Sequence, residues 1–336
     1  MGGNALKNTV TRRYQAEEYQ RAYVQISSCL TKICEYVNLV LAYREKESFG
    51  DIDLVVVPML DNEQDFIIRI ERLFKPNEIV KNKNIISFDY NELQVDLLVQ
   101  PDIETAKFAS KYFAYNDLGN FIGRTAHRLG FKFGHDGLKY VLRDPLDDSR
   151  VIKELLVTKD FADALRFLGY DPKLHEYGFF TKEEVFDYAA SSPFFDPAQY
   201  LLENRPSEAR RRDRTREMYR AMLEYYREKF NLQPVTPKTP VNRKEHLERA
   251  FSFFPKFKED YEKAMKEDVL NKEFNKNFNG NNFSKYFGVE GKELGEIMSR
   301  YRKYFEKHNL KFFVAKMSSE AFQEFVLSLQ TEVNNE

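Results

Sequence analysis

The feature that most constrains this chain is a pair of aspartates, Asp51 and Asp53, at the start of a short apolar segment. Side chains alternate along a strand, so the two carboxylates are expected on one face of a sheet, with Ile52 and Leu54 on the other. Carboxylates this close repel each other unless a cation lies between them. The pair therefore predicts either a cation site or a turn followed by an edge strand with solvated carboxylates.

A third carboxylate, Asp96, lies inside the apolar segment 93–100, where an unpaired charge is costly. If its strand neighbours the strand that holds Asp51 and Asp53, three carboxylates converge on the sheet. We expect them to bind Mg²⁺, a hard cation that proteins hold through carboxylates and substrate phosphates. Such a triad suits two-metal phosphoryl transfer, with Asp51 and Asp53 on the nucleotide's metal and Asp96 helping to hold the second ion.

The spacing of apolar residues predicts the class of fold. Residues 15–35 show the helical period of three and four, whereas the segments that follow are short and β-branched. Two of these segments flank Asn91-Glu92 as the arms of a hairpin, and from Arg205 onward almost everything reads as charged helix. We therefore predict an α+β protein, with a mixed sheet domain followed by helical domains. The expected domains are residues 1–100, 101–204 and 205–336.

Composition narrows the class of protein. The chain has 52 Lys plus Arg against 53 Asp plus Glu, so a face that binds a polyanion must be a local patch. No stretch approaches the roughly 18 apolar residues of a membrane span, and the first residues do not resemble a secretory signal. Two cysteines, Cys29 and Cys34, cannot supply a four-ligand zinc site or a disulfide scaffold. We expect a cytoplasmic protein with no membrane partner and no obligate protein partner.

The order of the three aspartates resembles the DNA polymerase β nucleotidyltransferase superfamily. Its signature is a small-residue turn, then D-h-D-h, then a lone h-D-h in a later strand, which 50–54 and 95–97 match. The resemblance implies a nucleotidyltransferase-type mixed sheet, two Mg²⁺ ions and a nucleoside triphosphate substrate. It places Arg44 and Gly50 at the triphosphate, with Ser48 in the same loop. Where the family has Gly-Ser, this chain has Leu41-Ala42.

Residues 112–124 resemble the family X polymerase segment Tyr-Phe-x-x-x-Asp-hydrophobic-x-Asn-x-x-x-Arg. By that resemblance Tyr112 and Phe113 flank the sugar, and Asp117 faces the base. Asn120 and Arg124 are four residues apart, so they share a helical face from which both would reach base edges. The structural alternative is that Asp117 is a helix N-cap and the two aromatic residues belong to the core.

Arg210, Arg211 and Arg212 begin an arginine-rich run on a predicted helix that continues through several tyrosines. Arginine with interleaved aromatic residues suits phosphate contacts and base stacking in a nucleic-acid complex. The alternative is a solvated helix face.

Residues 278–298 resemble the C-terminal helical element of tRNA CCA-adding enzymes and bacterial poly(A) polymerases. The glycines of that pattern, here including Gly291 and Gly295, are expected to let two short helices approach and to let backbone amides approach a phosphate. A helical hairpin without a ligand is the alternative.

These features together predict an enzyme that uses Mg²⁺ to add nucleotides to the 3′-hydroxyl of a nucleic acid without a template. RNA, in particular a tRNA-like RNA, is favoured over DNA by the C-terminal resemblance. Two alternatives stay open. One is a template-directed family X repair polymerase, favoured by residues 112–124. The other is a degenerate homologue that binds nucleic acid without catalysis, motivated by Leu41-Ala42.

Overall fold

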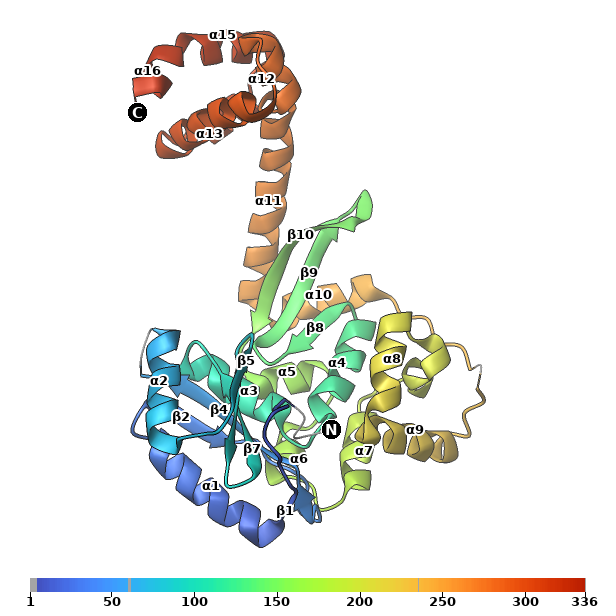
Figure 1. The fold of residues 1–336 in the computed structure, drawn as a ribbon. Coiled ribbons are helices and arrows are strands. Elements are labelled where there is room, and N and C mark those ends of the chain that lie inside the picture. Colours follow the sequence, from blue (N-terminus) through green and yellow to red (C-terminus); the bar gives the residue numbers. More distant parts are fainter. Residues whose placement is uncertain (1–4, 60–61, 235, 336) are drawn as a thin grey trace. The chain divides into compact units, whose positions relative to one another are not determined.

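Figure 1 shows the computed structural model of the chain, which describes residues 5–59, 62–234 and 236–335. Helices and strands are mixed, as the α+β prediction requires. Within the described residues the last strand ends at Thr158, and the elements beyond it are all helical.

The elements up to Thr158 form the sheets and the helices next to them. In chain order they are β1 (Tyr14–Gln15), α1 (Ala16–Leu30), β2 (Cys34–Leu39), β3 (Ser48–Phe49), β4 (Asp51–Pro58), α2 (Glu63–Phe74), β5 (Ile79–Asn82), β6 (Ile85–Tyr90), β7 (Leu93–Val99), α3 (Ile103–Phe113), α4 (Leu118–Arg128), β8 (Phe131–Gly134), β9 (Gly137–Asp144) and β10 (Asp147–Thr158). The later elements are α5 (Phe161–Phe167), α6 (Pro172–Tyr177), α7 (Lys182–Ala190), η1 (Pro197–Tyr200), η2 (Leu202–Asn204), α8 (Ser207–Thr215), α9 (Glu217–Lys229), α10 (Arg243–Phe253), α11 (Pro255–Asn277), α12 (Gly280–Phe287), α13 (Gly291–Lys307), α14 (Lys311–Ala315), α15 (Ser319–Ser328) and α16 (Gln330–Asn335).

The chain divides into two compact units. The first consists of Met1–Leu142 and Glu154–Phe257, and the second of Arg143–Lys153 and Lys258–Glu336. Strands β9 and β10 and helix α11 contribute residues to both. The boundaries expected at residues 100 and 204 lie inside the first unit, so residues 205–257 belong with the sheet and not with the helical tail.

A mixed five-stranded sheet forms the centre of the first unit, with strand order β2-β4-β7-β6-β5. Strands β4 and β7 are parallel, and the other neighbours are antiparallel. The predicted hairpin is confirmed: β6 and β7 are joined at Asn91 and Glu92, whose φ angles are 49° and 64°. Positive φ at both central residues is the geometry that matches the twist of a two-residue hairpin.

The two faces of this sheet carry different residues, because successive side chains of a strand point to opposite sides. On one face Ile52 and Leu54 are fully buried in a core that includes residues of α1 and α2, the two helices beside the sheet in Figure 1. On the other face Val55 and Val57 pack with Ala106 and Ala109 of α3. The aspartates at the start of β4 share that second face and stay partly exposed.

Helices α3 and α4 cross very closely at Gly119. A Cβ at this position would lie 2.2 Å from the main-chain oxygen of Tyr112 and 3.0 Å from its ring. Only glycine leaves room for such an approach of two backbones. The glycine therefore fixes the position of Tyr112 relative to α4.

A second, three-stranded sheet has the order β10-β9-β8. Strand β9 was expected from the sequence near residues 139–142, but β10 was missed because it begins with a run of charged residues. Within the first unit, Lys132 of β8 and Lys139 of β9 lie 2.7 and 3.8 Å from the Glu154 carboxylate of β10. Ion pairs between strands stabilise a sheet without producing an apolar pattern.

The second unit is a helical array with an aromatic core. Phe283, Tyr301, Phe305 and Phe322 are buried in it, and the Tyr301 hydroxyl donates to the Val326 carbonyl at 2.8 Å. Across the described part of the chain, no helix is both long enough and apolar enough to cross a bilayer.

Candidate metal centre

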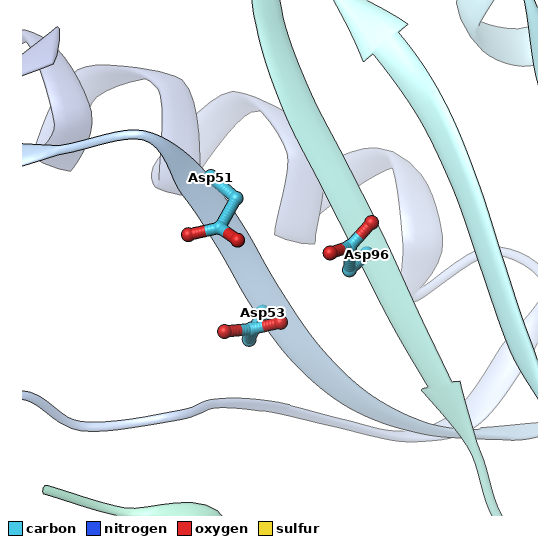
Figure 2. Close-up of side chains that lie close together, drawn as sticks. All are labelled: Asp51, Asp53 and Asp96. Atoms are coloured by element: carbon cyan, nitrogen blue, oxygen red, sulfur yellow. The ribbon is translucent and has the colours of Figure 1, made fainter. Parts of the chain in front are cut away.

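Asp51 and Asp53 of β4 and Asp96 of β7 lie on the same face of the central sheet. Asp53 is the register partner of Asp96 on the neighbouring parallel strand, and Asp51 is the partner of Gln94. One oxygen from each of the three carboxylates lies within 4.8 Å of the other two, and Figure 2 shows the side chains on the same side of the two strands. The predicted convergence is confirmed. The edge-strand alternative is wrong, because β4 lies between β2 and β7.

The electrostatics of this cluster oppose full ionisation. Burial raises the pKa of Asp53 well above its ordinary value, and the charges of Asp51 and Asp96 raise it further. Burial and the charge of Asp51 also raise the pKa of Asp96. Two charges about 5 Å apart repel by roughly 3 kcal/mol at an effective dielectric constant near 20. A bound cation would remove this repulsion.

Two neighbours hold the Asp96 carboxylate in place. The side-chain amide of Gln94 donates to both carboxylate oxygens at 2.9 Å, and its own oxygen accepts the N–H of Ala5 at 2.9 Å. Ser87 on β6 is a further hydrogen-bond partner of Asp96, and both contacts lower the Asp96 pKa against the effect of burial. Partners of this kind orient a metal ligand before the ion arrives. The sequence argument did not anticipate Gln94, although its spacing of two residues from Asp96 on one strand face was readable.

The donor set fits a hard divalent cation. All three candidate ligands are carboxylate oxygens, the ligands that Mg²⁺ and Mn²⁺ prefer over the sulfur and imidazole ligands typical of zinc. Opposite ligands of Mg²⁺ lie about 4 Å apart, so oxygens within 4.8 Å of one another need only small rotations to bind one ion. The described residues contain no other group of three or more acidic, histidine or cysteine side chains with this spacing.

Lys46, which the sequence argument overlooked, lies in the loop that leads to β4. Its ammonium group lies 4.8 Å from the centre of the Phe49 ring. Burial lowers the pKa of Lys46, and the charges of Asp51 and Asp53 act in the opposite direction. The signal in the sequence was a cation five residues before the first aspartate.

The three residues expected at the triphosphate lie between β2 and β4, in the same stretch of chain as Lys46. Gly50 directly precedes Asp51, and the Ser48 hydroxyl accepts from the Arg13 guanidinium at 3.1 Å. Arg44 is turned toward another segment, where it donates to the Tyr177 carbonyl at 2.7 Å and lies over the Tyr177 ring.

Leu41, which stands where the family has its Gly-Ser turn, is tied to the segment after α3. Its carbonyl accepts the N–H of Tyr115 at 2.6 Å, while its side chain is exposed. This backbone contact connects the loop before the aspartates with the segment 112–124.

The aromatic pair of that segment is half-buried at the end of α3. Tyr112 contacts the Phe113 and Phe133 rings, and Phe113 stacks on His135. Asp117 precedes α4, but its side chain makes no capping hydrogen bond. It accepts instead from Asn120 at 3.0 Å and from Arg216 at 2.6 Å. Asp117 thus stands at the N-cap position of α4 but does not cap the helix with its side chain, so the N-cap alternative is wrong about that hydrogen bond.

Arg124 is buried, whereas the resemblance implied an arginine that reaches a base edge. Its guanidinium donates to Asp213 at 2.9 Å and lies over the Tyr200 and Tyr219 rings. The pair joins α4 to α8. It could not be foreseen, because nothing in either helix alone signals a partner 89 residues away.

The three consecutive arginines of α8 do not share a face, because successive helical residues are turned by about 100°. Arg210 is half-buried and donates to the Arg205 carbonyl at 3.0 Å. Arg211 and Arg212 are exposed, and all three arginines belong to the first unit. The three arginines thus lie in the unit that contains the sheet, and their contact with a nucleic-acid backbone stays a prediction.

Gly291 and Gly295 lie at the start of α13 in the second unit. A Cβ at either position would meet nothing within 4 Å, so close approach of two helices is not the reason for these glycines. Gly291 has a φ of +62°, which glycine adopts readily. No neighbouring residue requires a glycine at Gly295.

Comparison with known proteins adds no family to this geometry. No protein-family model matches the chain, and no curated protein matches it.

Proposed function

We propose that this protein is a nucleotidyltransferase that uses two Mg²⁺ ions to add nucleotides from a nucleoside triphosphate to the 3′-hydroxyl of a nucleic acid. The single observation that carries the proposal is the convergence of Asp51, Asp53 and Asp96 on one face of two parallel strands, whose other face packs on a buried core. Nothing else among the described residues offers an all-oxygen site of this kind.

In this proposal Asp51 and Asp53 hold the ion that accompanies the triphosphate, and Asp96 helps to hold the second. Such ions polarise a phosphoryl oxygen and make a bound hydroxyl more acidic. The 3′-oxygen forms a bond to the α-phosphorus, the bond from that phosphorus to the bridging oxygen breaks, and pyrophosphate leaves. The hydroxyl proton goes to solvent.

Other residues are assigned by position. Lys46 balances carboxylate charge beside the phosphates, and Ser48 and Gly50 border the triphosphate. Tyr112 and Phe113 form an aromatic wall for the sugar, and the contact from Leu41 to Tyr115 keeps that wall attached to the loop. RNA is the preferred acceptor because residues 278–298 resemble an element of RNA-modifying enzymes.

The test is a transfer assay with radiolabelled NTPs and dNTPs on tRNA, single-stranded RNA and gapped DNA, in Mg²⁺ and in EDTA. Asp53→Asn is the matched control, because it removes a ligand with little change of shape. The proposal is supported if the wild type extends RNA in Mg²⁺ but not in EDTA, and Asp53→Asn does not extend it in either. Preference for gapped DNA replaces it with a template-directed polymerase, and no extension of any acceptor leaves a binding protein.

A further inference from the structure

A pocket of about 630 Å³ lies in the first unit, apart from the three aspartates. Its walls include residues of α4, of α8, of strand β8, of the stretch 199–206 and of the segment that leads into α10. We call it the arginine pocket after its cationic lining residues, which are Arg124, Arg128, Arg205, Arg212, Lys238 and Arg243. Its volume falls in the range of roughly 300–1,000 Å³ that is typical of small-molecule sites.

The charge of this pocket is strongly positive. No Asp or Glu of the described chain lines it. Two carboxylates stand behind the wall: Asp213 pairs with Arg124 and Arg205 at 2.9 and 3.3 Å, and Asp196 pairs with Arg128 at 2.9 Å. Six cations against two carboxylates leave a positive excess. Burial, and after it the neighbouring cations, lower the pKa of His127 in the same wall.

Several donors in this wall lack an acceptor. Nε and Nη1 of Arg124, Nε of Arg128 and the side-chain nitrogen of Gln199 are buried without a hydrogen-bond partner among the described residues. Arg124 is only 8% exposed. A buried donor left unpaired is costly, and the unpaired donors of Arg124, Arg128 and Gln199 all belong to residues that line this pocket.

We propose that the arginine pocket binds a phosphate-bearing ligand, either a free nucleotide or the phosphorylated end of a nucleic-acid strand. Guanidinium groups match phosphate oxygens in a two-pronged geometry, and a phosphate offers enough acceptors for several of them. The ring of Phe133 forms an apolar part of the wall, which suits the sugar or base attached to that phosphate. This assignment gives Arg124 to a phosphate instead of a base edge, and it does not depend on the metal centre.

Binding is measured by calorimetry with the full chain in EDTA, so that no metal ion bridges phosphate to the aspartates. The probes are pyrophosphate, tripolyphosphate, ATP, and an RNA octamer with either a 5′-phosphate or a 5′-hydroxyl. Two double variants are compared. The pocket double variant carries Arg212→Ala and Arg243→Ala, and the matched control carries Arg214→Ala and Lys244→Ala. All four side chains are exposed and the two doubles remove equal charge, but only the first pair lines the pocket.

The pocket double variant should bind the preferred probe about tenfold or more weakly, in line with the loss of charge-assisted hydrogen bonds, and the control double should bind like the wild type. Far-UV circular dichroism checks that both doubles fold. Tighter binding of the 5′-phosphorylated octamer than of its hydroxyl twin identifies a strand end, and tighter binding of ATP identifies a nucleotide. Equal affinity of the two doubles, or no binding of any probe at 1 mM, overturns the proposal.

The outcomes separate this site from the metal centre. Asp53→Asn should leave phosphate binding in EDTA unchanged. A wild-type chain that binds phosphate through this pocket but transfers no nucleotide would remove the proposed function and leave this inference standing.

Discussion

Asp53 and Asp96 face each other as register partners on two parallel strands, which sets their carboxylates side by side on one face of the sheet. Burial raises the pKa of both groups, and the charge of Asp51 raises both further. The folded chain without a metal therefore stores repulsion at the place where we propose that catalysis occurs.

Replacing Asp51, Asp53 or Asp96 by Ala should lower the rate of nucleotide transfer by more than about 10²-fold, because each change removes charge stabilisation of the transition state. The transfer assay with RNA and Mg²⁺ measures this effect. A variant that kept a tenth of the wild-type rate would remove its residue from the metal centre.

Asp53→Asn should raise the thermal midpoint of the metal-free chain and abolish the rise that Mn²⁺ or Mg²⁺ produces in the wild type. Relief of about 1 kcal/mol of repulsion corresponds to roughly 2–4 °C for a unit of this size. Circular dichroism at 222 nm is the suitable probe, because the chain has no Trp. If the divalent ion shifted the wild type and the variant equally, it would bind elsewhere.

The same carboxylates predict a pH dependence. Because the pKa of Asp53 is raised in the folded state, the folded chain keeps a proton that the unfolded chain has released. The free energy of unfolding then falls as pH rises from the ordinary carboxyl range through the raised pKa. The measurement is the difference between the urea midpoints of the wild type and of Asp53→Asn, taken in EDTA at a series of pH values. This difference should decrease as pH rises over that window, and a difference that does not change with pH would contradict the raised pKa.

Gln94→Ala should weaken metal binding by about 10- to 100-fold, because Asp96 loses the amide that holds both of its oxygens. The readout is the Mn²⁺ concentration for half-maximal rate, with the rate at saturating metal recorded beside it. A purely structural role would change the thermal midpoint but not this concentration.

Gly119→Ala should destabilise the first unit by about 1–3 kcal/mol, because its Cβ would collide with the Tyr112 main chain. Gly295→Ala is the matched control. It lies in a helix with open space at the Cβ position, so it should stabilise by about 0.5–1 kcal/mol. Urea unfolding measures both, and equal effects would mean that the crossing of α3 and α4 gives way.

The sequence was most informative where local pattern and chemistry coincide. Asp96 could be assigned to the triad because a charge inside an apolar strand needs a partner, and the turn at Asn91-Glu92 could be placed because two strand-like segments flank it. Both inferences use only a few neighbouring residues, and both are confirmed.

Long-range partners were beyond that reach. Periodicity identifies a helix but does not say which residue lies opposite it, so Arg124 could not be paired with Asp213 nor Gln94 with Ala5. Strand β10 was hidden by its charges, and the arginines of α8 were grouped by sequence adjacency although the helix turns them apart. The six cations of the arginine pocket come from four separate stretches of chain, so no sequence motif contains them together.

The parallel pairing of β4 with β7 also has a consequence for how the protein is made. Parallel neighbours cannot be joined by a tight turn, and here α2, β5 and β6 are all synthesised between the two strands. A nascent chain that has emerged only through Asp53 carries two of the three ligands and no third. The cation site thus comes into existence only when the last central strand has been added, and ion binding by a growing chain would report that the sheet is complete.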